Sequence, residues 1–412
     1  MNKKYNLKFL KKCQISKSKN IKNIFSLGYL PAVNDLIPIN QYAKEQKKYP
    51  TDLFYCKLSG LVQLGVVVDK KILFPKEYPY TSSTTKILRE NFRNLFKEVL
   101  KKISPSLKDL VIDIGSNDGN LLDNFKNHFR VLGVTPENIG KIAIKKGIPT
   151  ILDYFNSKTA NVIKKKYGLA KVVTATNVFA HIDDPNKVTN LIKTILSKDG
   201  IFISESHYLI RLLKDVQYDT IYHEHQRYYS VTSLNYLFNL HGLEIFDVKK
   251  INTHGGSIRV YASNKGKYTK SKAISKIIKE EKAILNQKQF DIFKKRVTLS
   301  KLKLIKLLIQ IKIENKKIAG IGAPSRSSTL INYVGLDSNL IDCIFEIKGS
   351  YKINKYAAGT KIPIKEEKIK DLNKYEYLLI FSWHIYPEII KNLKKKGYRG
   401  SFIIPLPRPK II

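Results

Sequence analysis

The chain has 412 residues, which is too long for one ordinary core and predicts two or three domains. A hydrophobic content of 43% with 26% charged residues is typical of a globular protein, and three cysteines are too few for a disulfide framework. The formal net charge of +40 comes from lysines spread along the chain, with few arginines. That spread indicates base-composition bias more than a nucleic-acid-binding patch, although such a field attracts anionic substrates.

The sequence shows neither a signal peptide nor a membrane span, so we expect a cytoplasmic protein. The most apolar long stretch, from Leu302 to Ile313, is interrupted by Lys303, Lys306 and Lys312. The small number of cysteines also fits a reducing compartment.

Residues 1–85 are rich in turn signals and predict a small, irregular N-terminal domain. Domains of this kind often need a metal to hold them together. Cys13 and Cys56 are present, but the positions three residues later hold Ser16 and Ser59. Because a serine hydroxyl is a poor zinc ligand, we interpret the two cysteines as ordinary buried residues.

From residue 86 to about 265, predicted strands and helices alternate, as in a doubly wound α/β domain. Leu110 to Ile114 is a short β-branched run of the kind that forms a buried parallel strand. The other predicted elements are a helix at 85–102, a helix at 119–127, a strand at 130–134, a helix at 139–146, a strand at 171–176, a helix at 185–197, and then a strand at 200–204, a helix at 231–241 and strands at 243–248 and 257–262.

The segment 268–316 is predicted to be a helical connector to a second α/β unit. The predicted elements of this unit are a strand at 318–321, a helix from about Ser327, and strands at 341–345, 377–381 and 401–404. The predicted fold class is therefore α/β, with two such domains and a small irregular one before them.

A glycine turn follows the strand 110–114 directly. Gly115 and Gly119 would let a ligand approach bare backbone at the carboxyl end of that strand, which is where cofactors bind in open α/β sheets. The spacing is neither the dinucleotide pattern nor a phosphate loop. The turn Asp113-Ile-Gly-Ser-Asn-Asp-Gly119 instead resembles the first cofactor motif of S-adenosylmethionine (SAM)-dependent methyltransferases, although a structural turn would look similar.

The densest group of chemically capable residues is Tyr222-His223-Glu224-His225. Its spacing is not that of a zinc hydrolase, and an imidazole with a carboxylate and a phenol beside it suits general acid/base chemistry. A loop of half-exposed aromatics is the plainer alternative. His254 on a glycine turn and His181 at a strand end add two more histidines to the same predicted domain.

Taken in order, these motifs resemble one family. The matching stretches are residues 114–119, Asn177-Val-Phe-Ala-His181, Asp219-Thr-Ile-Tyr-His-Glu-His225, 253–261, 320–324, 330–333, 359–364, 382–383 and 405–407. Together they are similar to the SAM-dependent sugar C-methyltransferases, which methylate nucleotide-activated keto-deoxysugars. The resemblance covers nearly the whole chain.

The resemblance implies three domains and assigns roles to residues. Residues 1–85 would be a degenerate zinc-binding domain, 86–265 a class I SAM-dependent methyltransferase domain, and 266–412 a connector with a Rossmann-like domain for the nucleotide sugar. The implied catalytic residues are His225 as the base, Tyr222, Glu224, His181, Tyr78 and Tyr80. The implied cofactor-binding residues are Asp113, Gly115, Ser116, Asn117, Asp118, Gly119, Glu137 and Asn177, and those for the substrate are His254, Arg326 and Tyr333.

The chemistry suits these residue types. A positioned imidazole can remove a proton from a carbon next to a ketone, and Tyr222 or His181 can donate to the resulting enolate oxygen. The carbon then attacks the sulfonium methyl in line, which mainly demands orientation. We further expect a nucleotide-sugar substrate, a monomer, and no nucleic-acid or membrane partner.

The sequence departs from the family pattern at two places. Only Cys13 and Cys56 remain of the four zinc cysteines, so we expect no zinc. The acid expected to bind the cofactor ribose is replaced by Thr135, so either Glu137 takes over that contact or the cofactor is held more weakly.

Two alternatives remain open from the sequence. A nucleic-acid methyltransferase would explain the positive charge and would show steeply salt-dependent nucleic-acid binding. A non-catalytic binding protein would explain the two departures and would have no measurable SAM affinity.

Overall fold

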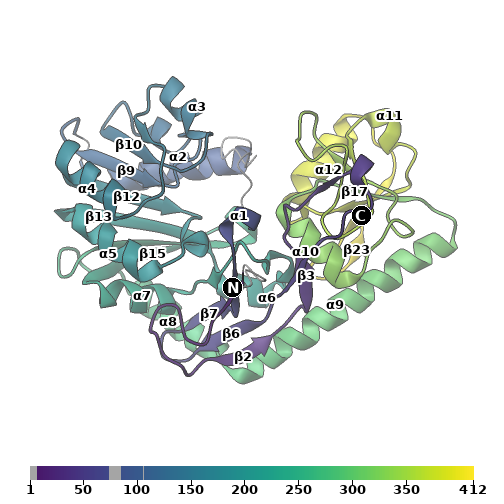
Figure 1. The fold of residues 1–412 in the computed structure, drawn as a ribbon, viewed down its shortest axis with the longest axis horizontal. Helices are drawn as coiled ribbons and strands as arrows, with labels where there is room; N and C mark the ends of the chain where they lie inside the picture. The colour runs from purple at the N-terminus through teal and green to yellow at the C-terminus, as the bar shows by residue number, and fades with distance from the viewer. Residues whose placement is uncertain (1–6, 74–84, 105) are drawn as a thin grey trace, which may run out of the picture.

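The computed structural model describes residues 7–73, 85–104 and 106–412. Figure 1 shows a large sheet with its helices at one end of the molecule and a second α/β sheet at the other, with strands of the N-terminal segment lying between them. The long helix α9 (Gln287–Ile313) runs below the N-terminal strands towards the second sheet. At 1.5 Å per residue it is about 40 Å long. Within the described ranges, no helix is long and apolar enough to cross a membrane.

The large sheet has seven strands in the order β11-β10-β9-β12-β13-β16-β15. Their bounds are β9 (Leu110–Ile114), β10 (Arg130–Val134), β11 (Thr150–Ile151), β12 (Ala170–Thr176), β13 (Leu196–His207), β15 (Leu243–Ile251) and β16 (Ser257–Asn264). The strands β9 to β13 pair in parallel, whereas β16 is antiparallel to both neighbours. Every residue of β9 is buried, and the strand order reverses direction there. The carboxyl end of β9 is therefore the expected ligand crevice.

The helices of this part mostly follow the sequence expectation. Their bounds are α2 (Lys86–Leu100), α3 (Gly140–Lys145), α4 (Ser157–Lys166), α5 (Pro185–Ile195), α6 (Leu209–Lys214), α7 (Val231–Leu240) and α8 (Lys272–Ile284). The helices α4, α5 and α7 are preceded by the N-cap residues Asn156, Asp184 and Ser230, whose side chains accept bonds from first-turn backbone N–H groups.

The predicted helix at 119–127 is wrong. The structure has only a 3₁₀ turn there, η3 (Leu122–Asn124). Leu121, Leu122 and Phe125 are buried as their spacing suggested. However, the Asn124 side chain donates to the carbonyl of Asn120 at 3.0 Å and so competes with regular helical bonding.

The second sheet has the order β20-β18-β17-β21-β22-β23, with only β23 antiparallel. The elements of this part are β17 (Ile318–Ile321), α10 (Ser325–Val334), β18 (Ile344–Glu346), β19 (Lys355–Tyr356), β20 (Ile364–Glu366), α11 (Ile369–Leu372), β21 (Tyr377–Ile380), α12 (Tyr386–Lys395), β22 (Ser401–Ile404) and β23 (Lys410–Ile411). The predicted α/β class, with two doubly wound sheets, is confirmed.

The N-terminal segment is less irregular than its turn signals predicted. It contains α1 (Lys70–Leu73), β1 (Leu7–Phe9), β2 (Lys22–Phe25), β3 (Tyr29–Pro31), β4 (Ile37–Pro38), β5 (Lys48–Pro50), β6 (Leu53–Cys56), β7 (Leu61–Leu64) and β8 (Val66–Val68). These strands are two to four residues long, too short for a clear alternation pattern. Two of them pair outside the segment: β7 with β14 (Arg227–Tyr228), and β4 with β19.

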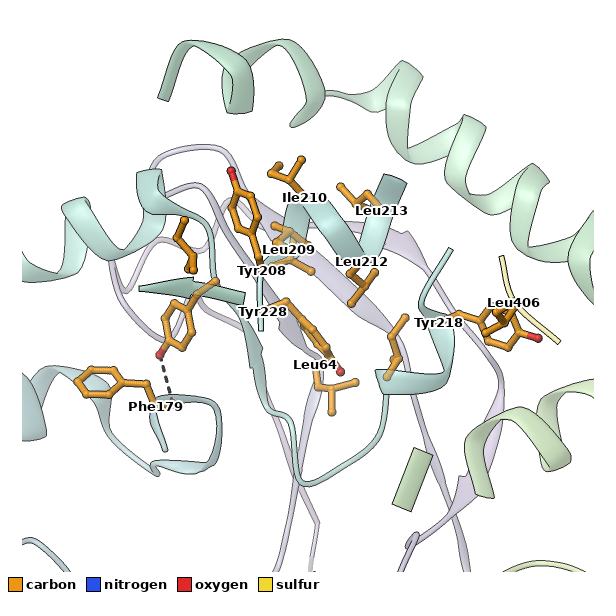
Figure 2. Close-up of a cluster of buried hydrophobic side chains, with 14 of the residues drawn as sticks. Leu64, Phe179, Tyr208, Leu209, Ile210, Leu212, Leu213, Tyr218, Tyr228 and Leu406 are labelled. Atoms are coloured by element: carbon orange, nitrogen blue, oxygen red, sulfur yellow. Dashed lines mark hydrogen bonds between the residues drawn. The ribbon is translucent and has the colours of Figure 1, made fainter. Parts of the chain in front are cut away.

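One buried cluster connects the three parts of the chain. Figure 2 shows Leu64 of β7, Phe179 and Tyr218 of the central part, and Leu406 near the C-terminus within it. The N-terminal strands therefore complete the core of the other two parts.

A buried ionic network fixes α2 to the large sheet. Arg259 of β16 is 1% exposed and donates to Glu205 of β13, which is fully buried, at 2.7 Å. It also donates to Glu98 and to the side chain of Asn91 on α2, at 2.8 Å each. Neighbouring negative charges keep the guanidinium ionised despite burial, and raise the pKa of Arg259.

Replacing Arg259 with methionine should destabilise the protein strongly, because Glu205 would lose its buried cationic partner. We expect a loss of about 3–5 kcal/mol in the free energy of unfolding, measured by urea denaturation. Lys249→Ala is the matched control, since Lys249 pairs with Glu98 at the surface and its loss should cost under about 1 kcal/mol. Equal effects of the two variants would contradict this assignment.

The two cysteines and two serines of the N-terminal segment lie together. Cys13 Sγ and Ser59 Oγ are 3.2 Å apart, and Cys56 Sγ and Ser16 Oγ are 3.4 Å apart. Burial opposes ionisation of the Cys56 thiol, but hydrogen bonds from the two serines and from Cys13 lower its pKa. This Cys–Ser quartet does not fit zinc, because hydroxyls replace two of the four thiolates that a structural site needs. No group of three or more His, Cys, Asp or Glu side chains in the described ranges is arranged to hold a metal ion.

Changing Ser16 and Ser59 together to cysteine should create a zinc site, because four thiols would then surround one point. We expect about one zinc per chain after purification, with a higher melting temperature, and no stoichiometric zinc in the unchanged protein. Metal analysis by mass spectrometry measures this. The control, Ser16→Cys with Ser26→Cys, adds the same number of thiols but only one at the quartet. A double Ser16/Ser59 variant that retains no zinc would refute the prediction.

Candidate active site

The glycine turn after β9 has the bare backbone that a cofactor would need. Gly115 and Gly119 have φ angles of +77° and +78°, and a side chain at Gly115 would come within 2.4 Å of Val178. Between them Asn117 also has a positive φ of 50°. The hydroxyl of Ser116 is buried and has no hydrogen-bond partner among the described residues. The turn therefore fits the SAM contact that the sequence predicts.

The acids around this turn occupy different environments. Asp113 is buried within β9 and accepts a bond from Thr174 of β12 at 2.6 Å. Burial raises the pKa of Asp113 to about 7, with the charge of Glu205 adding to the effect. Asp118 is buried too, and its carboxylate lies 3.8 Å from the Lys146 ammonium. Asp113 thus lies under the turn, bonded to the neighbouring strand.

The end of β10 carries a partly buried acid. The hydroxyl of Thr135, itself buried, donates to the Glu137 carboxylate at 2.5 Å. Thr135 therefore holds the Glu137 carboxylate close to the end of β10. This geometry favours Glu137 as the residue that takes over the ribose contact.

The segment 177–181 connects the glycine turn with the loop of residues 219–225, which we call the histidine loop. Asn177 has a φ of +58°, and its backbone N–H donates to the backbone carbonyl oxygen of Glu205 at 2.8 Å. Val178 packs over Gly115. His181, in η4 (Phe179–His181), lies with Nδ1 at 2.8 Å from the carbonyl oxygen of Glu224, so that nitrogen carries the proton.

His225 lies at the end of the histidine loop with a defined tautomer. Its Nδ1 lies 2.9 Å from the carbonyl oxygen of Thr220, to which it donates, leaving Nε2 as the acceptor in the neutral ring. The ring centres of Tyr222 and His181 lie 4.1 and 5.1 Å from that of His225. Burial, then the neighbouring His181, lowers the pKa of His225 well below its ordinary value. His225 is therefore neutral at pH 7.

Two further residues of the histidine loop, His223 and Glu224, contact the N-terminal segment. His223 Nε2 is 3.1 Å from the carbonyl oxygen of Pro50, and burial lowers the pKa of His223 to about 4. Glu224 is buried, and its carboxylate accepts a bond from the Asn34 side chain at 2.7 Å. Shortly after His225, Arg227 and Tyr228 form β14, which pairs antiparallel with β7.

Arg326, at the start of α10 in the C-terminal part, forms an ion pair with Asp219 of the histidine loop. Its guanidinium donates twice to Asp219, at 2.7 and 2.8 Å, and once to His384 at 3.0 Å. The indole N–H of Trp383 also donates to Asp219, at 2.7 Å. Arg326 is thus 7% exposed and ion-paired, rather than freely available for a diphosphate, and its predicted substrate contact stays a prediction.

The other two predicted substrate residues, His254 and Tyr333, lie near the Arg326–Asp219 ion pair. His254 has a φ of +53°, and its Nε2 is buried without a hydrogen-bond partner among the described residues. Burial and then the charge of Arg326 lower the pKa of His254 to about 4. Tyr333 of α10 packs edge-on against Tyr218, with ring centres 5.1 Å apart.

The structure brings His181, Tyr222, Glu224 and His225 together, whereas Tyr78 and Tyr80 lie outside the described residues. Sequence reasoning missed Asn34, Asp219, His207 and His384. Asp219 lies within the motif that carried the resemblance, which was the available signal for it. His207 ends β13, and its ring bonds to Gln217 at 2.8 Å. Nothing in the sequence pattern distinguishes Asn34 or His384.

Comparison with known proteins identifies the family of the chain. Family models match residues 13–74 as a putative zinc binding domain, 87–248 as a methyltransferase domain and 252–407 as a C-methyltransferase C-terminal domain. The C-methyltransferase NovU of Streptomyces niveus is 31% identical over 409 residues, which cover 97% of this chain and 96% of that protein.

Solved structures give weaker matches. A SAM-dependent methyltransferase from Clostridium acetobutylicum is 14% identical with a TM-score of 0.33, covering 45% of this chain and 94% of its own. A magnesium protoporphyrin IX methyltransferase from Synechocystis is 14% identical with a TM-score of 0.32, covering 42% and 78%. Scores this low support no inference, so the assignment rests on the family models and on NovU. The chain therefore belongs to the family of SAM-dependent C-methyltransferases.

Proposed function

We propose that the enzyme methylates a carbon next to the ketone of a nucleotide-activated keto-deoxysugar, with His225 as the base. The observation that carries this proposal is the bond from His225 Nδ1 to Thr220, which leaves Nε2 free of a proton. A neutral, oriented imidazole beside a phenol is suited to removing a proton from carbon.

In this mechanism the proton moves from carbon to Nε2 of His225, and the electron pair left behind forms an enolate. Burial first, and then the nearby charge of Glu224, raises the pKa of Tyr222 well above its ordinary value. Tyr222 therefore keeps its proton and can donate to the enolate oxygen. The Nδ1–H of His181 is already donated to the carbonyl oxygen of Glu224, so Tyr222 is the better donor of the two.

The cofactor supplies an electrophilic methyl group on sulfur when bound. The residues that would hold it are those of the glycine turn and its neighbours, namely Asp113, Gly115, Ser116, Asn117, Asp118, Gly119, Glu137 and Asn177. Asp113, bonded to Thr174, would support the turn from below. Glu137, positioned by Thr135, would accept from the ribose hydroxyls.

The sugar assignment rests on the motif pattern and on residues near the Arg326–Asp219 pair. Arg326 and Tyr333 are on α10, where they contact Asp219 and Tyr218. Burial and then the charge of the nearby Arg326 lower the pKa of His254. A nucleotide could extend from the reacting sugar towards these residues. The net charge of +40 favours encounter with a diphosphate-bearing substrate. Residues 266–412 would then bind the nucleotide.

Replacing His225 with alanine should remove the base without disturbing the cofactor site. We expect methyl transfer to a nucleotide-linked 4-keto-deoxysugar to fall by about 10²–10⁴-fold, with the dissociation constant for SAM unchanged by calorimetry. Deuterium uptake next to the ketone, followed by NMR in D₂O without SAM, reports the proton step alone and should disappear too.

His128→Ala is the control for this experiment, since His128 is an exposed histidine after η3 and far from the loop in sequence. It should retain normal activity. Near-normal turnover by His225→Ala would reject the assignment of the base. Transfer of the methyl to oxygen, or only to nucleic acid, would reject the proposed reaction.

The rate should depend little on pH around neutrality, because the lowered pKa of His225 keeps its ring unprotonated. Between pH 8 and pH 6 we expect kcat to change by less than about twofold, whereas a base with an ordinary histidine pKa would lose about fourfold. Saturating steady-state assays across this range measure it. A fourfold fall with a midpoint near pH 6.5 would contradict the buried, neutral state.

A further inference from the structure

We propose that Asn34 is a positioning residue that holds the Glu224 carboxylate beside the base, an inference that rests on the proposed role of the histidine loop. Asn34 lies in the turn between β3 and β4, within the N-terminal segment. The turn is closed by the Leu36 N–H, which donates to the Asn34 carbonyl at 3.0 Å. No cofactor or substrate contact of the resemblance involves this residue.

The side-chain amide of Asn34 contacts the other two parts of the chain at once. Its Nδ2 donates to Glu224 Oε1 at 2.7 Å. Its Oδ1 lies 3.3 Å from the Tyr351 hydroxyl and 3.4 Å from that of Ser325, both in the C-terminal part. Glu224, Tyr351 and Ser325 therefore meet at a single amide.

The chemistry of these neighbours fixes which way the amide faces. Burial, followed by the charges of Glu224 and Glu346, raises the pKa of Tyr351 to about 12, so its hydroxyl is a donor at neutral pH. A donor requires the amide oxygen opposite it, which directs the NH₂ group to the carboxylate. The reverse orientation would place Oδ1 against a carboxylate oxygen.

The backbone that follows each of the two residues is held in a strand pair. After Asn34, β4 pairs with β19 of the C-terminal part, in the register Ile37 opposite Tyr356. After Glu224, β14 pairs with β7 of the N-terminal sheet. The backbone near each residue is therefore tied to a strand, Asn34 through β4 to β19 and Glu224 through β14 to β7, and the bond between the two side chains needs little further ordering.

A shift of Glu224 would also displace the catalytic groups. Its backbone carbonyl accepts the bond from His181, and His225 is the next residue. The carboxylate also faces Lys352, whose pKa is lowered by burial while Glu346 and Glu224 oppose that shift.

The test uses the full-length enzyme and three variants, Asn34→Ala, Asn34→Asp and Asn34→Ala in a Glu224→Gln background. Loss of the amide should lower kcat by about 10- to 100-fold, because sub-ångström displacement of reacting groups costs this much, while KM and the SAM dissociation constant stay within about twofold. Asn34→Asp keeps the shape but opposes Glu224 with a second carboxylate, so its loss should be larger. In the Glu224→Gln background, Asn34→Ala should cause little further loss.

Asn23→Ala is the matched control, since Asn23 makes the same kind of bond, to Asp52 at 3.3 Å, within the N-terminal segment. It should behave as the unchanged enzyme. Equal activity of Asn34→Ala and Asn23→Ala, or additive losses in the Glu224→Gln background, would overturn the proposal while leaving the reaction intact. If the unchanged enzyme itself fails to methylate the keto sugar, the proposed function fails, and a melting-temperature cycle of Asn34→Asp with Glu224→Gln still shows whether the two side chains are coupled.

Discussion

The buried ion pair between Arg326 and Asp219 is the contact on which the histidine loop depends. Burying two charges is costly, and the cost is offset here by two bonds between them, a third from Trp383 and a fourth from Arg326 to His384. Asp219 begins the loop and Arg326 begins α10. The pair therefore sets the position of the loop relative to the C-terminal sheet, while β14 sets it relative to the N-terminal one.

Burial of the loop also determines its electrostatics. Histidines from three different elements lie within reach of the charge of Arg326, and burial together with that charge lowers the pKa values of His207 and His254. One fixed cation therefore accompanies several neutral rings. In such surroundings tautomers are set by backbone carbonyls, as at His181 and His225, and the direction in which each ring can accept a proton follows from the chain fold.

The sequence allowed the β9 turn, the positions along the chain of most main strands of the two sheets, and the importance of the histidine motif to be predicted, because each depends on a local pattern. It misled at 119–127, where Asn124 bonds to the backbone and prevents a regular helix. Asn34 could not have been found, because its role comes from contacts with residues 190 and more positions away. The Cys–Ser quartet was visible as missing ligands, but its hydrogen bonds needed coordinates.

The pairing of β14 with β7 joins residues more than 160 positions apart, and β14 begins two residues after His225. Contacts of such long range form late, because the loop between them must be closed first. During synthesis most strands of the central sheet can therefore form before β14, next to the histidine loop, pairs with β7. If this pairing forms last, enzymatic activity appears only after the central sheet has folded, when β7 pairs with β14.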